Sequence, residues 1–246
     1  MKAINSANHG KPANILQATD LTKRYGEEDA ISGITFAASS GEVLGIVGPN
    51  GAGKTTLLEI LVGLIPADSG NVQWRGETLP ASRRKQAMFY LPDGIRPYQD
   101  RFTLDVLNFF AGVYGHSAAE VSAVIASVEL APALRKRVCA LSKGYNRRLL
   151  LALGLLTPQN VLLMDEPFDG FDLRQSRNIV QLLRKEVARG RTLVLAIHQL
   201  ADAERVCDRF LLLAGGRVQG MGTLRELRMK TGLLQGSLED IFLALT

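Results

Sequence analysis

Short apolar runs separated by helical stretches dominate the chain from about residue 43 onward. Four of these runs, at residues 43–47, 161–164, 193–197 and 210–213, have the composition of strands that are buried on both faces of a parallel sheet. Residues 54–64 follow the first run with a helical pattern. Because strands and helices alternate, and their crossovers are right-handed, we predict an α/β core.

The beginning and the middle of the chain depart from this pattern. Residues 15–37 contain strand-like segments, and residues 70–76 alternate in the way of an exposed antiparallel strand. From about residue 103 to residue 156 the periodicity becomes helical, and Ser117 and Glu120 form a capping box ahead of an apolar stripe. We therefore predict a helical insertion in the middle of the α/β core.

Composition places the chain among globular proteins. Hydrophobic residues make up 46% of the 246 residues and charged residues 22%, which is ample for a buried core. No apolar run approaches the ~20 residues that span a bilayer. Residues 1–14 are polar and lack the apolar centre of a signal peptide. We expect residues 1–14 to form a flexible tail ahead of a single domain over residues 15–246.

The net charge and the two cysteines point to no particular ligand or metal. The net charge is +5, but the basic residues are scattered, and no nucleic-acid partner is expected. We interpret the short basic clusters at residues 83–85 and 147–148 as solvated faces. Cys139 and Cys207 lack the spacing of metal ligands, so we expect free thiols in a reducing cytoplasm.

A phosphate-binding loop lies between the first buried strand and the helix that follows it. Residues 48–55, Gly-Pro-Asn-Gly-Ala-Gly-Lys-Thr, match the pattern GxxxxGK[ST] in full. Its glycines let backbone N–H groups turn toward a phosphate, which the helix N-terminus also attracts. We expect Lys54 to contact the β- and γ-phosphates and the Thr55 hydroxyl to bind Mg²⁺. The predicted ATP-binding residues of this loop are Gly48, Pro49, Asn50, Gly51, Ala52, Gly53, Lys54, Thr55 and Thr56.

An acidic pair follows the second buried strand. Asp165 stands at the carboxyl end of that strand, where α/β sheets place their ligands, and its carboxylate can hold Mg²⁺ through water. Glu166, one residue on, is placed to polarise an attacking water. The phosphate loop and this pair together predict a nucleotide hydrolase with Glu166 as its base.

The sequence Leu-Ser-Lys-Gly-Tyr at residues 141–145 lies between the loop and the acidic pair, and it resembles the signature of ATP-binding cassette (ABC) ATPases. The resemblance extends from about residue 15 to the end of the chain. In that family the signature closes on ATP held by another cassette, which implies a homodimer or a pseudo-symmetric cassette dimer. The resemblance also implies a P-loop core of mainly parallel sheet, an N-terminal antiparallel β subdomain and a helical subdomain at about residues 95–156.

The residues of the signature are suited to bind a phosphate group. Ser142 can cap a helix that begins near Tyr145, so that its hydroxyl and the Gly144 N–H face a phosphate. Lys143 stands where the family usually has a second glycine, and its positive charge does not oppose an anionic ligand. We therefore expect Ser142, Lys143 and Gly144 to contact ATP.

Other positions also match residues of the family. Tyr25 matches the aromatic that stacks on adenine, Asp172 the acid of the D-loop, and His198 the switch histidine that contacts the γ-phosphate. Asp93 is a departure, because the family has Gln or Glu at the position that touches Mg²⁺ and the attacking water. Asp has suitable oxygen ligands but is one methylene shorter, and Gln99 is an alternative for this role.

The resemblance implies the ATPase subunit of a transporter, bound to a separate transmembrane permease on the inner face of the cell membrane. The apolar residues between positions 102 and 110 lie where the family docks its membrane partner. Residues 238–246 resemble the endings of exporter-type subunits, which favours export. Two alternatives stay open: a soluble ABC ATPase of the iron–sulphur assembly type, and a weakly hydrolysing nucleotide switch suggested by Asp93.

Overall fold

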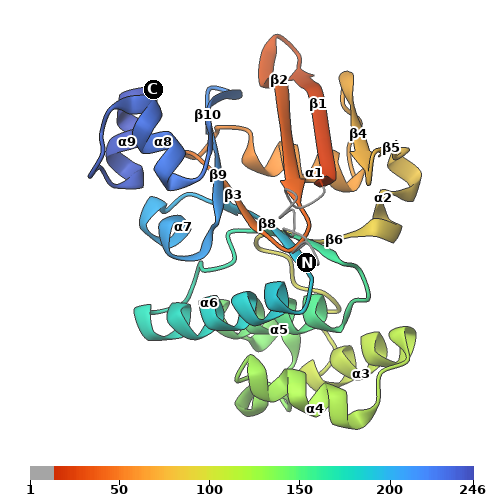
Figure 1. The fold of residues 1–246 in the computed structure, drawn as a ribbon. Helices are drawn as coiled ribbons and strands as arrows, with labels where there is room; N and C mark the ends of the chain where they lie inside the picture. Colours follow the sequence, from red (N-terminus) through yellow and green to blue (C-terminus); the bar gives the residue numbers. More distant parts are fainter. Residues whose placement is uncertain (1–13) are drawn as a thin grey trace, which may run out of the picture.

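The structure is a computed structural model that describes residues 14–246, with two sheets and helices around them (Figure 1). Except for Asn14, the predicted tail lies outside the described residues. The larger sheet has the strand order β10-β9-β3-β8-β7-β6, and all its neighbouring pairs are parallel except β9 with β10. Its strands are β3 (Val43–Val47), β6 (Met88–Leu91), β7 (Val161–Asp165), β8 (Thr192–Ile197), β9 (Arg209–Ala214) and β10 (Arg217–Gly222).

The apolar runs of this sheet are explained by burial on both faces. In β3 every residue is buried, and alternate residues belong to different hydrophobic clusters: Val43 and Val47 to one, Leu44 and Ile46 to the other. Successive side chains of a strand point to opposite faces, so both faces of the sheet require apolar side chains. The predicted α/β core with a mainly parallel sheet is confirmed.

The smaller sheet is antiparallel and has the order β2-β1-β4-β5. The strand-like segments predicted before residue 38 are two long strands in the structure, β1 (Asn14–Tyr25) and β2 (Glu28–Ser39). The strand predicted at residues 70–76 is β4 (Ser69–Trp74), which pairs with β1 and is followed by the short β5 (Glu77–Thr78). Three of the six β4 residues are exposed, as expected.

Helices pack against the sheets and also form a separate helical region below them in Figure 1. The capping box predicted at Ser117 is present and begins α4. The signature helix begins at Lys143, two residues before the predicted start at Tyr145, with Ser142 as its N-cap. No helix of residues 14–246 is long and apolar enough to cross a membrane. The helices are α1 (Lys54–Val62), α2 (Ala81–Ala87), α3 (Thr103–Tyr114), α4 (Ala118–Ser127), α5 (Lys143–Leu156), α6 (Leu173–Ala188), α7 (Leu200–Val206), α8 (Leu224–Thr231) and α9 (Leu238–Leu245).

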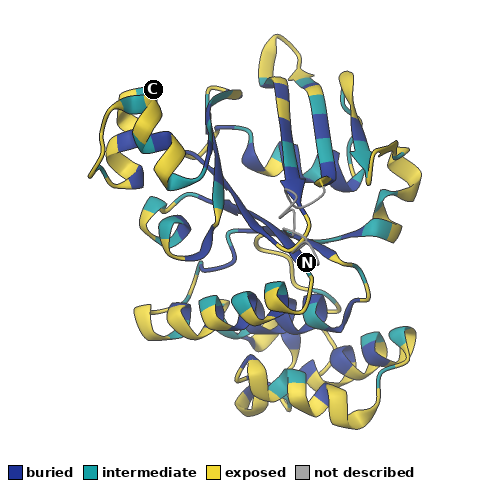
Figure 2. Ribbon diagram, viewed as in Figure 1, coloured by how far each residue is buried: buried dark blue, intermediate teal, exposed yellow. Residues whose placement is uncertain are grey.

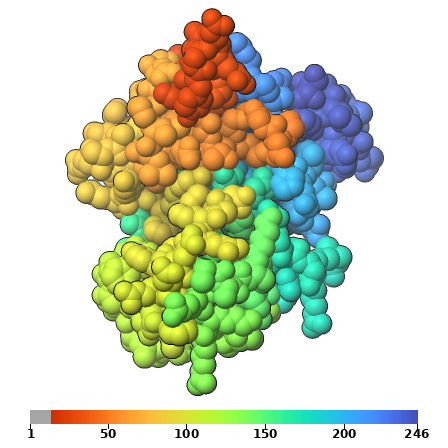
Figure 3. Space-filling model, turned by 180° about the vertical axis from the view of Figure 1, so that it is seen from behind, coloured from red at the N-terminus to blue at the C-terminus, as the bar shows by residue number. Residues whose placement is uncertain are grey.

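The helical region consists of α3, α4 and the first part of α5, with short 3₁₀ turns at Ala131–Ala133 and Val138–Ala140. Seen from behind, it forms the lower lobe of the molecule, and the antiparallel sheet forms the top (Figure 3). The signature therefore lies at the start of a helix that runs from this lobe to the sheet.

The basic cluster at residues 147–148 is not the solvated face that we predicted. Arg147 is only 4% exposed and Arg148 6% exposed, within a helix whose remaining length is almost wholly buried (Figure 2). Each guanidinium has a carboxylate partner, Asp93 for Arg147 and Glu129 for Arg148. The expectation was wrong because arginine can be buried where its charge is paired and its donors are bonded.

The other cluster, at residues 83–85, is mostly exposed, although Arg84 is half-buried and donates to the main-chain oxygens of Leu79 and Ile60. The two cysteines are free thiols, as predicted. Cys139 is exposed, and Cys207 is buried.

Candidate functional site

The phosphate loop joins β3 to α1 and lies tightly against the backbone of other strands. A Cβ atom on Gly48 would lie 2.1 Å from the main-chain oxygen of Leu213 in β9. Gly53, the N-cap of α1, has a φ of 94°, and a Cβ there would lie 2.4 Å from the Ala30 oxygen in β2. Glycine is required at both positions because no larger residue fits the space.

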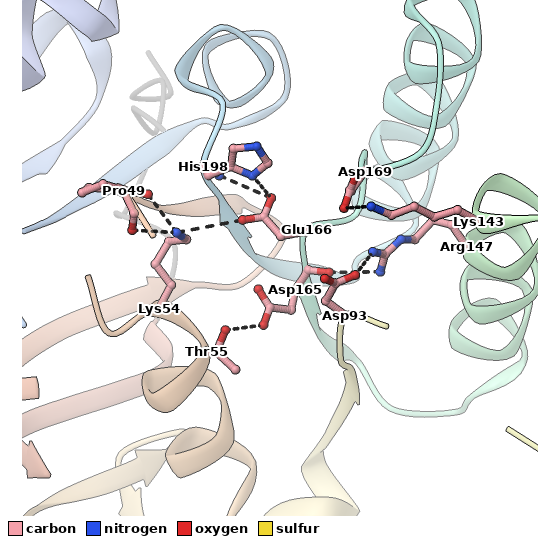
Figure 4. Close-up of polar contacts among 11 residues, drawn as sticks. Pro49, Lys54, Thr55, Asp93, Lys143, Arg147, Asp165, Glu166, Asp169 and His198 are labelled. Carbon is pink, nitrogen blue, oxygen red and sulfur yellow. Dashed lines mark hydrogen bonds and ion pairs between the residues drawn. The ribbon is translucent and has the colours of Figure 1, made fainter. Parts of the chain in front are cut away.

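Lys54 lies inside this loop. It is 6% exposed, and its Nζ donates to the main-chain oxygens of Gly48, at 2.8 Å, and Pro49, at 3.1 Å (Figure 4). Glu166 Oε1 is 3.9 Å from the same nitrogen. Burial lowers the pKa of Lys54, and the nearby Glu166 and Asp165 carboxylates oppose that shift. The ammonium group is thus held among oxygens at the centre of the loop, where an incoming phosphate can meet it.

The Thr55 hydroxyl donates to Asp165 Oδ2 across a distance of 2.6 Å, which joins the loop to the end of β7. Asp165 is 3% exposed, and burial raises its pKa, against the hydrogen bond from Thr55. Within residues 14–246 no group of three or more His, Cys, Asp or Glu could hold a metal by itself. One hydroxyl and one carboxylate fit Mg²⁺, which is commonly bound by one or two carboxylates together with substrate phosphates.

Glu166 is held in an unusual backbone conformation. Its φ is 49°, in the left-handed region, and its N–H donates to the Ala196 oxygen of β8 at 2.9 Å. Its Oε2 lies 2.7 Å from His198 Nδ1. Burial raises the pKa of Glu166, and the hydrogen bond from His198 opposes the rise. A strained conformation held by its surroundings is typical of functional positions.

These groups face one cavity, hereafter the P-loop cavity. Ten predicted site residues line it, six from the loop and four from distant segments. One of the four is Tyr25 at the rim, which is 55% exposed. His198 does not line the cavity, but its ring contacts Glu166, which does. The cavity is lined by Tyr25, Glu28, Asp29, Ala30, Asn50, Gly51, Gly53, Lys54, Thr55, Thr56, Asp93, Asp165 and Glu166.

Ser142, Lys143 and Gly144 line a second hollow, hereafter the signature hollow, which shares no lining residue with the P-loop cavity. The Ser142 hydroxyl accepts from the Tyr145 N–H at 3.4 Å. Lys143 Nζ lies 2.5 Å from Asp169 Oδ2. The signature therefore packs on residues 168–172 of its own chain and still opens to the outside.

Residues 168–172, which match the D-loop of the family, contact the signature at Gly170 and cap α6 at Asp172. A Cβ atom on Gly144 would lie 3.0 Å from the main-chain oxygen of Gly170, so the two segments approach closely. Asp172, predicted to contact ATP, is the N-cap of α6 and accepts from the Gln175 N–H at 2.8 Å. Asp172 is thus engaged in a helix cap in the single chain.

Asp93 and Arg147 lie together beside the P-loop cavity. Asp93 lines the P-loop cavity, whereas Gln99 does not, and the main-chain oxygen of Gln99 accepts from Cys139 N at 3.0 Å. Arg147 binds Asp93 beside the cavity, and it was not among the predicted site residues. Its burial could have been predicted from helical periodicity, because Arg147 lies on the same face of α5 as Leu150 and Leu151, three and four residues on, which are buried.

Comparison with known proteins agrees with this geometry. Residues 31–169 match the family model described as ABC transporter. The chain is 35% identical to Nod factor export ATP-binding protein I of Ralstonia nicotianae over 222 residues, which cover 87% of this chain and 68% of that protein. The protein of the same name from Rhizobium etli is 34% identical over 85% of this chain and 68% of its own length.

Solved structures agree as well. One described as the ATP binding subunit of an ABC transporter matches with a TM-score of 0.84 and 28% identity, over 94% of this chain and 99% of that one. A bacterial Atm1-family ABC exporter with ATP bound shares the fold, with a TM-score of 0.80 and 22% identity over 97% of this chain and 44% of that one. The chain belongs to the ABC transporter family, as an ATPase that forms the ATP-binding subunit of a transporter.

Proposed function

We propose that this subunit binds MgATP in the P-loop cavity, dimerises on it and drives export through a separate membrane permease. The observation that carries the proposal is the separation of the two hollows. One contains the groups that hydrolysis requires, and the other contains the signature but no phosphate loop. A second copy of the cassette brings the two kinds of surface together on one nucleotide.

In the P-loop cavity each group has a role that follows from its position. The loop N–H groups and Lys54 bind the β- and γ-phosphates, and Tyr25 at the rim stacks on adenine. Thr55 and Asp165 hold Mg²⁺, with Asp93 as a further oxygen ligand on the same cavity wall. When bound, Mg²⁺ neutralises charge on the phosphate oxygens.

Glu166 is the general base. It accepts the proton of the attacking water while the bond between the β- and γ-phosphates breaks and ADP leaves. Its raised pKa makes the carboxylate a stronger base than an exposed glutamate. His198 fixes the carboxylate through the 2.7 Å contact and lies at the end of β8, from which it can contact the γ-phosphate.

The signature hollow suits the γ-phosphate of ATP held by the other cassette. Ser142 and the N-terminus of α5 supply a hydroxyl, N–H groups and a positive helix end, and Lys143 adds a cation. Asp172 accepts from the N–H of Gln175, which lines the same hollow. None of these residues lines the P-loop cavity of its own chain, which supports a nucleotide that is held by a second cassette.

The test uses Glu166→Gln, which removes the base and leaves both hollows intact. We expect this variant to form a dimer in the presence of MgATP, measured by size-exclusion chromatography with light scattering. Lys54→Ala in the same background is the matched control and should stay monomeric. A monomer at high concentrations of both protein and MgATP would contradict the proposed dimer.

For the permease, the structure offers an exposed apolar surface on the helical region, hereafter the α3 patch. Val106 and Leu107 of α3 are buried, but other apolar side chains around this helix are open to solvent. Tyr98 and Phe109 touch edge to face, with ring centroids 5.6 Å apart. The patch consists of Tyr98 (54% exposed), Phe102 (46%), Leu104 (36%), Phe109 (54%) and Val113 (61%).

Exposed apolar side chains that touch one another commonly mark an interaction surface. The α3 patch begins at Tyr98, shortly after Asp93 in the chain, so the segment between them connects a partner bound there to a wall of the P-loop cavity. The export direction is supported by the names of the Ralstonia nicotianae and Rhizobium etli relatives. We place the subunit on the inner face of the cell membrane, where its permease would hold it.

A further inference from the structure

Arg147 is a buried cation that joins two segments of the P-loop cavity. Its side chain is 5% exposed, yet its two terminal nitrogens reach different elements (Figure 4). Nη1 donates to the main-chain oxygen of Asp165 at 3.1 Å, and Nη2 pairs with Asp93 Oδ1. One planar guanidinium thus connects the end of β7 to the segment that follows β6.

The preceding residue of α5 holds the same segment. Asn146 is 7% exposed, and its Nδ2 donates to the main-chain oxygen of Ile95 at 2.8 Å. Two successive residues in the first turns of α5 therefore fix residues 93–95. Because α5 begins at the signature, this helix mechanically links the signature hollow to the P-loop cavity.

Charge explains why the position opposite Arg147 is acidic. A buried guanidinium without a counter-charge is strongly unfavourable, so it requires an anion within reach. Asp93 supplies that anion, and 45% of its own side chain stays exposed. Asp93 also lines the cavity with Asp165 and Glu166, and Arg147 offsets the repulsion that a third carboxylate brings to this wall.

We propose that Arg147 is a positioning residue that, paired with Asp93, holds the wall of the P-loop cavity against the end of β7 and couples it to the signature helix. Arg147 does not line the cavity, so it acts through Asp93 and the Asp165 main chain. The proposal rests on the proposed function of the cavity. It assigns the acid at position 93 to charge pairing, which a glutamine there cannot supply.

The test is a double-mutant cycle on the full chain with Asp93→Gln, Arg147→Gln and the two combined. For each single variant we expect kcat to fall about tenfold, because positioning is lost. Arg147→Gln leaves every group that lines the cavity in place, so its Kd for a fluorescent ATP analogue should stay within about twofold of wild type. The double variant should be no slower than the slower single variant. If the two losses multiply to about 100-fold, the residues act independently, and the pairing is wrong.

Arg147→Lys separates positioning from charge. Lysine keeps the cation but cannot reach Asp93 and the Asp165 oxygen with a planar fork, so we expect its melting temperature to stay near that of wild type while kcat falls. Wild-type kcat in this variant would overturn the coupling. This variant also keeps the test available if Asp93→Gln, which leaves Arg147 unpaired, fails to fold.

Arg148→Gln is the matched control. Arg148 is a buried arginine one residue on, but it pairs with Glu129 and donates to the Val128 oxygen. It lines the signature hollow and does not line the P-loop cavity. Combined with Asp93→Gln, its effects should simply multiply, and a non-multiplicative result would contradict a coupling specific to Arg147. A wild-type protein that binds no ATP analogue would reject the proposed function itself, whereas binding and turnover with a multiplicative Arg147 cycle would reject only the pair.

Discussion

The P-loop cavity and the signature hollow are built in opposite ways. In the cavity Lys54 and Asp165 are 6% and 3% exposed, and each functional group is bonded to another before any ligand arrives. In the hollow the Lys143 side chain is 62% exposed, and Ser142 is engaged only in its helix cap. A site whose charged groups are buried and already positioned supports chemistry. An exposed surface with a helix N-terminus supports reversible association with a second cassette. The two regions therefore fit the two sides of one ATP site in the proposed dimer.

The strongest test of this contrast removes the cation of the cavity. Lys54→Ala should lower ATP turnover on the order of 100-fold or more, because the loop loses the charge that it holds at its centre. Binding of a fluorescent ATP analogue and phosphate release report the loss. Lys85→Ala, an exposed lysine of α2, is the control and should behave as wild type.

The reverse experiment changes only the hollow. Lys143→Glu, in the Glu166→Gln background, places a second negative charge beside Asp169 and should weaken MgATP-dependent dimerisation at least about tenfold. Sedimentation equilibrium measures the dimer, and nucleotide binding by the monomer should be unchanged. If monomer binding falls as well, the two regions are not independent, and the contrast is wrong.

A smaller effect is expected on the pH dependence of kcat, which depends on Glu166 in the cavity. Glu166 acts as a base when it is deprotonated, so kcat is high above its pKa and falls as the pH drops through that value. The hydrogen bond from His198 lowers the pKa of Glu166, so His198→Ala should shift this acid limb to higher pH. The pH profile of kcat at saturating MgATP is the measurement. His116→Ala removes a histidine bonded to the Leu156 oxygen and should leave the limb in place.

The smallest effect on the chemistry is expected at the α3 patch, which belongs to neither hollow. Phe109→Ser replaces an exposed aromatic and should leave ATP hydrolysis by the isolated subunit within about twofold of wild type, because exposed substitutions disturb the fold little. Its association with membranes of cells that express the whole transporter should be lost. Leu243→Ser, which alters a residue of α9 that is 70% exposed, should keep that association. Equal loss in both variants would argue against a specific docking site.

The sequence predicted those features that depend on residues close together in the chain. The strand at residues 43–47 was predictable because both of its faces are buried, and the capping box at Ser117 because its hydrogen bonds are local. The phosphate loop has a pattern that few other structures share. The tail helix α9, with its capping box at Ser237, follows the same local rules.

Features set by distant contacts were not predictable in the same way. The burial of Arg147 depends on Asp93, which is far away in the chain, so the two-arginine cluster resembled a solvated face. The family resemblance alone would favour Asp93→Gln as a harmless change, because the family commonly has Gln there, whereas the pairing with Arg147 predicts a loss of activity. The left-handed backbone at Glu166 has no local signal, because Glu ordinarily avoids that region.

The place of β3 in the sheet has a consequence for how the subunit is made. Its residues 43–47 pair with β8 at 193–197 on one side and with β9 on the other. The ribosome therefore releases the phosphate loop long before it supplies β8 and β9, the two supporting neighbours of β3. Long-range parallel pairing of this kind forms late. A chain that ends before β8 holds the nucleotide-binding sequence without the strands that support it, so we expect affinity for ATP only after β8 and β9 have been made.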